Sequence, residues 1–139
     1  MKKLFVISFA VLSLLACKKT EFSPEGPTDV RIRNISDQTF NEVIMKTSDN
    51  EEDIDTLGTI NANSVSDYFR FTKAYPKAEI SAKINIGDVV STYSTGDVDF
   101  TYLQYLGQDR ITFEVWISDP GNKKLEIFNV IHEEPLVIK

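Results

Sequence analysis

The chain has 139 residues, a formal net charge of −6 and a single cysteine. This length fits one domain, and the acidic balance argues against nucleic acid as a partner, because phosphate contacts need clustered Lys and Arg. One cysteine excludes a disulfide within the chain, so the stability of the domain must come from a hydrophobic core.

Residues 1–16 have the composition of a secretory signal peptide. Lys2 and Lys3 form a short basic start, and the stretch Leu4–Ala16 that follows carries no charge. A basic start, an apolar stretch and a small residue before the cleavage point are typical of such signals. The stretch is shorter than the roughly 20 apolar residues that a membrane-spanning helix needs. The sequence therefore predicts export and removal of residues 1–16.

The end of this stretch, Leu14–Leu15–Ala16–Cys17, resembles the lipobox of bacterial lipoproteins. In that family the signal is cut before the cysteine, a diacylglycerol is joined to the cysteine sulfur, and the new amino group is usually acylated. Two or more acyl chains make a stable anchor, whereas one holds a protein only marginally. The resemblance implies that Cys17 is lipidated and that the lipid bilayer is a partner. The alternative is an ordinary signal peptide with a chance cysteine.

Residues 17–28 are expected to form the lipidated cysteine and a flexible tether. The segment Lys18–Thr28 has two prolines, a glycine and almost no apolar content, so it cannot fold alone. The signal and the size of the chain resemble those of small envelope lipoproteins of Bacteroidota. In those proteins, surface export is associated with acidic residues soon after the cysteine. Lys18 and Lys19 occupy those places here. We expect a lipid anchor in the cell envelope, at the outer membrane, with the periplasmic side favoured over the cell surface.

Residues 29–139 are expected to form one domain of short strands. The segment Lys77–Ile86 alternates strictly between polar and apolar residues, which indicates a strand with one buried face. Gly87–Asp88 suits a two-residue hairpin loop before a strand over 89–94. A second hairpin is expected over 110–118 and 125–132, joined by the turn Asp119–Asn122.

The remaining apolar segments predict further strands and a fold class. They cover 29–35, 40–47, 54–60, 65–71, 100–106 and a short edge strand at 136–138, with one helical turn possible within 71–77. About seven to nine short strands with regular turn signals favour an all-β, antiparallel, immunoglobulin-like sandwich. A small barrel is the alternative.

Catalytic chemistry has little support in the sequence. The chain has one histidine, His132, and lacks a Gly-x-Ser-x-Gly nucleophile motif, a glycine-rich phosphate loop and the several His or Cys residues of a zinc site. Paired carboxylates, as in glycoside hydrolases, remain open because acidic residues are plentiful. We predict a protein that is not an enzyme and uses no cofactor.

Two polar segments are weighed as sites. Asp49, Glu51, Asp53 and Asp55 place carboxylates at alternating positions, and Ca²⁺ prefers several oxygen ligands. The EF-hand pattern fails at Ile54, and we favour a solvated acidic loop that binds no metal. The sequence Asp55–Thr56–Leu57 resembles the short site at which Bacteroidota attach O-glycans, which implies Thr56 as an acceptor if it is exposed.

Aromatic residues in the last third are candidates for ligand binding. Tyr102, Tyr105 and Trp116 could stack on sugar rings or anchor a protein partner. The alternative, which we favour for Trp116, is that it covers a second core face. The sequence thus predicts a membrane-anchored envelope lipoprotein with a non-enzymatic β-sandwich for binding or assembly. A lipid-anchored carbohydrate-binding module is the alternative, and a small hydrolase is the third class.

Overall fold

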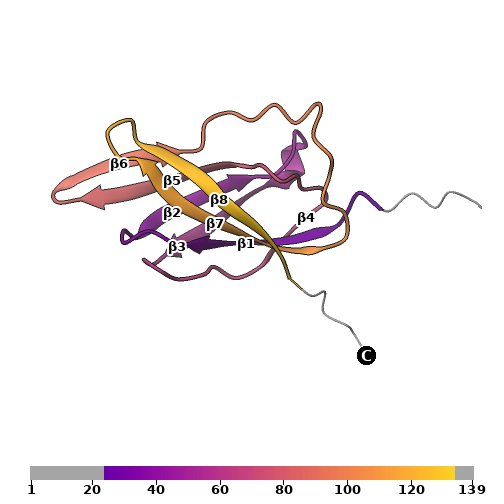
Figure 1. Ribbon diagram of the computed structural model, residues 1–139, viewed down its shortest axis with the longest axis horizontal. Coiled ribbons are helices and arrows are strands. Elements are labelled where there is room, and N and C mark those ends of the chain that lie inside the picture. The colour runs from indigo at the N-terminus through magenta and orange to yellow at the C-terminus, as the bar shows by residue number, and fades with distance from the viewer. Residues whose placement is uncertain (1–23, 134–139) are drawn as a thin grey trace, which may run out of the picture.

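The computed structural model describes residues 24–133, and these residues form an all-β domain (Figure 1). Its strands and its one short 3₁₀ helix alternate with turns and one long connection. They are β1 (Thr28–Asn34), β2 (Phe40–Lys46), η1 (Glu51–Asp53), β3 (Ile54–Ile60), β4 (Phe69–Phe71), β5 (Glu79–Ile86), β6 (Val89–Ser94), β7 (Arg110–Asp119) and β8 (Lys124–Glu133).

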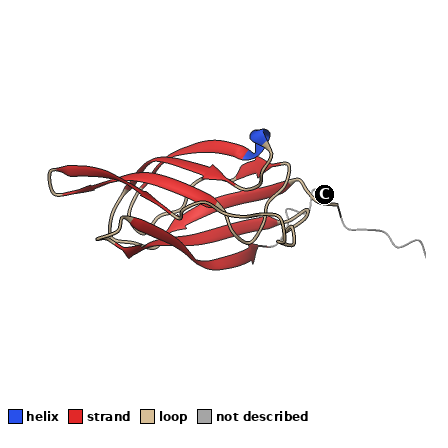
Figure 2. Ribbon diagram, turned by 90° about the horizontal axis from the view of Figure 1, so that it is seen from above, coloured by secondary structure: helices blue, strands red, loops and turns tan. Residues whose placement is uncertain are grey.

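All eight strands belong to one sheet with the order β3-β2-β5-β6-β8-β7-β1-β4. The sheet curls until β3 contacts β1 and β4, so it approaches a closed barrel (Figure 2). Two neighbouring pairs, β1–β7 and β6–β8, are parallel, and the second consists of the single pair Ser94–Lys124. The expected antiparallel, immunoglobulin-like sandwich is therefore not confirmed, because the sheet is mixed.

The parallel pairing follows from the connection between β6 and β7. Residues 95–109 form no strand, although a strand was expected over 100–106. Instead Phe100 is buried and packs against Tyr75 with ring centroids 5.4 Å apart. The connection carries the chain to the end of the domain where β1 begins, so β7 starts beside β1 and runs in the same direction.

The core lies inside the curled sheet and is built from alternating strand residues. Ala78, just before β5, and the expected inner positions Ile80, Ala82 and Ile84 of β5 are buried, which confirms the assignment of faces there. Ile86 is exposed because the strand has passed the end of the core. The largest fully buried side chains come from seven of the eight strands, all except β6. They are Phe40, Phe71, Phe113, Ile32, Met45, Ile60, Ile80, Ile84, Ile111, Leu125, Val30 and Val43.

Some expected elements differ from the structure. The strand expected over 65–71 is confined to β4, with Val65 forming only an isolated bridge to Arg33. Segment 71–77 contains no helical turn, and η1 was not expected. The edge strand expected at 136–138 lies outside the described residues. Across residues 24–133 no helix is long and apolar enough to span a membrane.

The two ends of the domain differ in a way that matters for function. The described chain begins at one end, where β1 starts. The β5–β6 hairpin extends past the rest of the sheet at the opposite end, where the β1–β2 and β7–β8 turns also lie (Figure 1). We call this the hairpin end.

Candidate binding surface

Trp116 lies on the outer face of β7, near the hairpin end, and 39% of its surface is exposed. Phe128 of β8 is 65% exposed, and its ring meets the indole edge-on, with centroids 6.0 Å apart and an interplanar angle of 72°. The interpretation that Trp116 covers a second core face is therefore wrong. No second layer covers this indole among the described residues, and its neighbour is another exposed aromatic ring.

Phe128 was not identified from the sequence, although alternation from the buried Leu125 places it on the outer face of β8. Val115 pairs with Ile127 and Glu114 pairs with Asn129, so Phe128 has no partner residue in the ladder. The bulge leaves Phe128 and Asn129 on the same outer face, and Val130 returns to the core side. The available signal was an apolar residue at an outer position of β8, two residues after the exposed Glu126.

A groove of about 300 Å³ adjoins Trp116 at the hairpin end. Ile35 and Gln38 contribute from the β1–β2 turn, and Ile117 and Pro120 from the end of β7 and the turn after it. Ile86 of the projecting hairpin completes the wall. The groove thus has an apolar side, formed by Ile35, Ile86, Trp116, Ile117 and Pro120, and a polar side, formed by Ser36, Asp37 and Gln38.

The hairpin tip adds exposed apolar surface to this groove. Ile86, Val89 and Val90 are 46%, 64% and 59% exposed. They flank the two-residue loop Gly87–Asp88, with Ile86 paired to Val89, as the sequence predicted. Val90 pairs with Asn85 and therefore points to the opposite face of the hairpin from Ile86 and Val89. We call the exposed set Ile86, Val89, Trp116 and Phe128 the apolar end surface.

The tyrosines expected to join Trp116 lie elsewhere. Tyr102, 93% exposed, and Tyr105 belong to the connection that precedes Arg110, the first residue of β7. The six residues from Arg110 to Trp116 span about 20 Å of extended strand. The three candidates therefore do not form one aromatic strip.

The acidic run does not converge on a metal site. Asp53 is completely buried, and its carboxylate accepts hydrogen bonds from the Ser48 hydroxyl at 2.6 Å and from the Thr72 hydroxyl and backbone N–H at 2.8 and 2.6 Å. Burial acts to raise the pKa of Asp53, but these hydrogen bonds outweigh it and hold that pKa below its ordinary value of 3.8. Asp53 thus fixes the loop after β2 to the end of β4.

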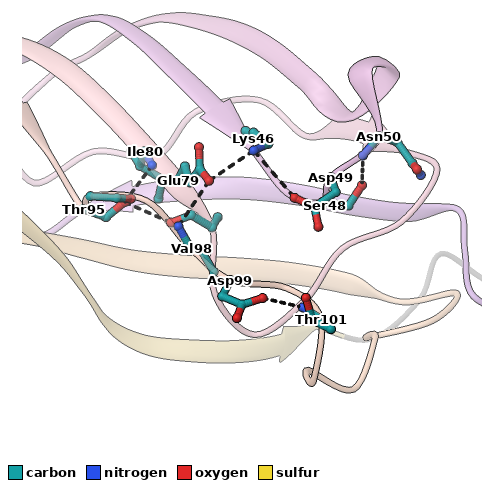
Figure 3. A network of polar contacts seen from close by, with 12 residues as sticks. Lys46, Ser48, Asp49, Asn50, Glu79, Ile80, Thr95, Val98, Asp99 and Thr101 are labelled. Carbon is teal, nitrogen blue, oxygen red and sulfur yellow. Dashed lines mark hydrogen bonds and ion pairs between the residues drawn. The ribbon is translucent and has the colours of Figure 1, made fainter.

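The other acidic side chains of the run stay apart from Asp53. Asp49 faces Lys46, whose ammonium lies 3.8 Å from the Asp49 carboxylate and 3.1 Å from that of Glu79 (Figure 3). Glu51 and Asp55 are exposed. Within residues 24–133 no three His, Cys, Asp or Glu side chains gather closely enough to hold a metal ion.

Glu79 has a second structural role in the same network. Its carboxylate accepts the backbone N–H of Val98 at 3.2 Å, while the Thr95 hydroxyl accepts the N–H of Ile80 at 2.9 Å (Figure 3). These bonds fix the start of the long connection beside β5. A wider groove of about 450 Å³ separates this connection from β8.

Two further candidates have definite places. Thr56 is exposed on β3, a strand at the margin of the sheet, so the condition for glycosylation is met and the modification stays a prediction. His132 pairs with Asp109 through Nδ1 at 2.6 Å on the exposed end of β8. This contact joins β8 to the residue before β7. The lipidation candidate Cys17 lies outside the described residues.

The outer face near the start of β7 is a network of paired polar groups. Arg31 donates to the Thr112 hydroxyl at 2.9 Å and approaches Glu133 at 3.4 Å, and Thr112 donates to Glu133 at 2.8 Å. The guanidinium groups of Arg31 and Arg110 lie 4.6 and 4.4 Å from the ring centroid of Tyr68. These polar groups already have hydrogen-bond, ion-pair or ring partners within the domain. We therefore regard the apolar end surface as a stronger candidate for binding a partner than this polar face.

Comparisons with known proteins support the fold and leave the function open. No protein-family model matches the chain, and no curated protein matches it. The structure is similar to an NMR structure of a protein from Eubacterium rectale, with a TM-score of 0.50 and 13% identity over 74% of this chain and 89% of that one. At this identity the likeness concerns the fold alone.

Proposed function

We propose that this protein is a membrane-anchored envelope lipoprotein whose β domain has no enzymatic activity and binds a protein partner through the apolar end surface. The lipid anchor rests on the lipobox resemblance of Leu14–Cys17. The binding role rests on one observation, which is the cluster of exposed apolar side chains at the hairpin end.

The composition of this surface favours a protein partner. Single exposed apolar residues are common on protein surfaces and need no explanation. A contiguous exposed apolar patch, in contrast, is typical of an interaction site. Tryptophan dominates binding energy at many interfaces, because it buries a large area in one rigid side chain. Trp116 has this position beside Ile86 and Ile117 in the groove.

The position of the surface agrees with an anchor at the N-terminal side. The described chain begins at the end of the domain opposite the hairpin end (Figure 1). Lipid on Cys17 would therefore hold the other end of the domain near the bilayer and leave the apolar end surface open. The periplasmic side of the outer membrane remains the favoured place for this arrangement.

The carbohydrate-binding alternative has less support. Sugar recognition by stacking needs aromatic rings that share one surface, and Tyr102 and Tyr105 are separated from Trp116 by most of β7. The exposed ring that does adjoin Trp116 is Phe128, which has no polar group to bind a sugar hydroxyl.

Recovery of cross-linked partners from the native membrane tests the proposal. Wild-type protein and two single variants, Ile86→Asp and Lys83→Asp, are cross-linked in place and purified. Ile86 belongs to the apolar end surface, whereas exposed Lys83 of the same strand lies outside it, with its ammonium 2.6 Å from Glu42. We expect the partner with wild type and Lys83→Asp and its loss with Ile86→Asp. Equal recovery from all three would refute the proposal.

A further inference from the structure

The outer edge of β6 has an open backbone. On its other side β6 pairs continuously with β5, from Ile86–Val89 to Ser81–Ser94, without a register shift. On the side that faces β8, Ser94 alone is paired among residues 24–133. The rest of that edge, up to the tip of the hairpin, therefore has backbone groups without a strand beside them in the described part of the chain.

This edge lacks the usual protection against pairing. Natural edge strands carry charged residues, proline or bulges that prevent a second strand from adding to them. The β6 sequence, Val-Val-Ser-Thr-Tyr-Ser, has no charge and no proline, although 26% of the whole chain is charged. It is rich in β-branched and aromatic residues, which favour strand pairing.

The register identifies the backbone groups that are free to pair. The Ser94 N–H donates to the Lys123 carbonyl on the β8 side, at 3.2 Å. Backbone groups of an antiparallel strand alternate between its two edges, so Val90 and Thr92 present their N–H and C=O groups on the same side as Ser94. A strand added here would pair with Val90 and Thr92.

We propose that the strand added to this edge is β6 of a second copy of the chain, in antiparallel orientation. Val90 of each copy then pairs with Thr92 of the other, and Ser91 lies opposite Ser91 on the two-fold axis. The inference rests on the proposed function, because it names the partner of the hairpin end. Cross-strand pairing of β-branched residues stabilises such a contact, and no like charges oppose each other.

Length and charge favour a second copy over an unrelated strand. The open edge ends at Ser94, where Lys124 of β8 occupies the neighbouring position. The hairpin of a second copy fits this short edge, because its β6 strand also ends in a turn, at Gly87–Asp88. In the proposed register Asp88 of each copy lies beside the Lys123–Lys124 end of the other. Opposite charges therefore meet at both ends of the paired strands.

The pairing is compatible with the proposed anchor. Each chain begins at the end of its domain opposite the hairpin (Figure 1). In the antiparallel dimer the first described residues of the two chains therefore lie at its outer ends. The contact is small, and attachment of both copies to one membrane raises their effective concentration.

A single engineered cysteine tests the register in the full chain at its native membrane. In Ser91→Cys the two thiols lie on opposing strands at a non-hydrogen-bonded pair, where Cα atoms are about 4.5 Å apart, a separation that permits a disulfide. Asn85→Cys, an exposed position on β5 of the same hairpin that does not lie on the open edge, is the control. We expect a reducible dimer from Ser91→Cys and a monomer from Asn85→Cys under mild oxidation.

Charge reversal in the Ser91→Cys chain provides a second measurement. Asp88→Lys and Lys124→Glu should each lower the dimer yield several-fold, and the combination should restore it, because opposite charges meet again. A monomeric Ser91→Cys chain, equal yields from both cysteine positions, or no rescue by the double reversal would overturn the pairing. If the pairing fails while Ile86→Asp still loses a cross-linked partner, the proposed function stands with a different protein as the partner.

Discussion

The indole of Trp116 and the ring of Phe128 meet edge-to-face at 6.0 Å on the outer surface of the domain. Two residues from neighbouring strands thus form an exposed aromatic pair, because Trp116 of β7 and Phe128 of β8 both lie on the outer face of the sheet. Edge-to-face pairs of this kind contribute about 0.5–1.5 kcal/mol beyond the area they bury. The pair therefore holds Trp116 in place without removing it from solvent.

The fluorescence of Trp116 is expected to report this exposure. It is the single tryptophan of the chain, so its emission describes one site. We expect a red-shifted emission maximum and efficient quenching by acrylamide, and more quenching in Phe128→Ala. Trp116→Ala should cost about 1 kcal/mol of unfolding free energy, well below the 3–5 kcal/mol typical of buried Trp. A blue-shifted, poorly quenched signal would show that the indole is covered.

The faces of β5 predict opposite outcomes for two adjacent substitutions. Ile84 is fully buried, so Ile84→Asp would place an unpaired charge in the core and cost several kcal/mol, on the order of 4. Lys83 is exposed and paired with Glu42, so Lys83→Asp should cost less than about 1 kcal/mol. Urea unfolding of both variants measures the difference. Equal losses would contradict the assigned faces.

Asp53 is expected to make stability depend on pH. Its pKa is lower in the folded protein than the ordinary 3.8, so its stabilising contribution is complete above that value and is lost as the pH falls through the folded pKa. Asp53→Asn should lower the unfolding free energy by about 1–3 kcal/mol at pH 7, because buried hydrogen bonds are lost. The difference from wild type should narrow below pH 3.8.

Asp55→Asn is the control for that experiment, since Asp55 is exposed on β3. Unfolding in urea across a pH series should show little change for this variant at neutral pH. If Asp53→Asn lost stability equally at all pH values, ionisation of Asp53 would not be the source of its contribution.

Cys17→Ala is expected to abolish retention in the membrane while the domain still folds. The anchor depends on one residue, and β1 begins only at Thr28. Fractionation followed by a high-salt wash, with circular dichroism of the released protein, measures both properties. Variant protein that stays in the washed membrane fraction would contradict the proposed lipid anchor.

Local patterns in the sequence were sufficient for most strands. Period-two alternation identified the faces of β5, and turn residues located the hairpin loops at Gly87–Asp88 and Asp119–Asn122, because these features depend on neighbouring residues along the chain. The segment 100–106 was wrongly expected to be a strand. Phe100 is buried against Tyr75 while Tyr102 is exposed, and apolar content alone does not distinguish such a loop from a strand.

Tertiary structure decided how the candidate residues are combined. Alternation showed that Trp116 faces away from the core set of β7, but whether another layer covers it depends on the whole sheet. The acidic residues 49–55 likewise looked alike in the sequence. In the fold Asp53 is buried and accepts a hydrogen bond from Thr72, which distinguishes it from the other acidic residues of the run. Contacts between residues distant in the chain carry no periodic signal, so these outcomes could not be predicted.

The sequence by itself determined an all-β domain, the positions of its clearest hairpins and the lipobox resemblance that motivates the anchor at Cys17. Only the tertiary structure decided that β1 and β7 run parallel, that Phe128 joins Trp116, and that the uncharged β6 lies open beside the start of β8. The physical reason is that strand formation depends on local side-chain pattern, whereas pairing depends on which backbone edges the folded chain brings together.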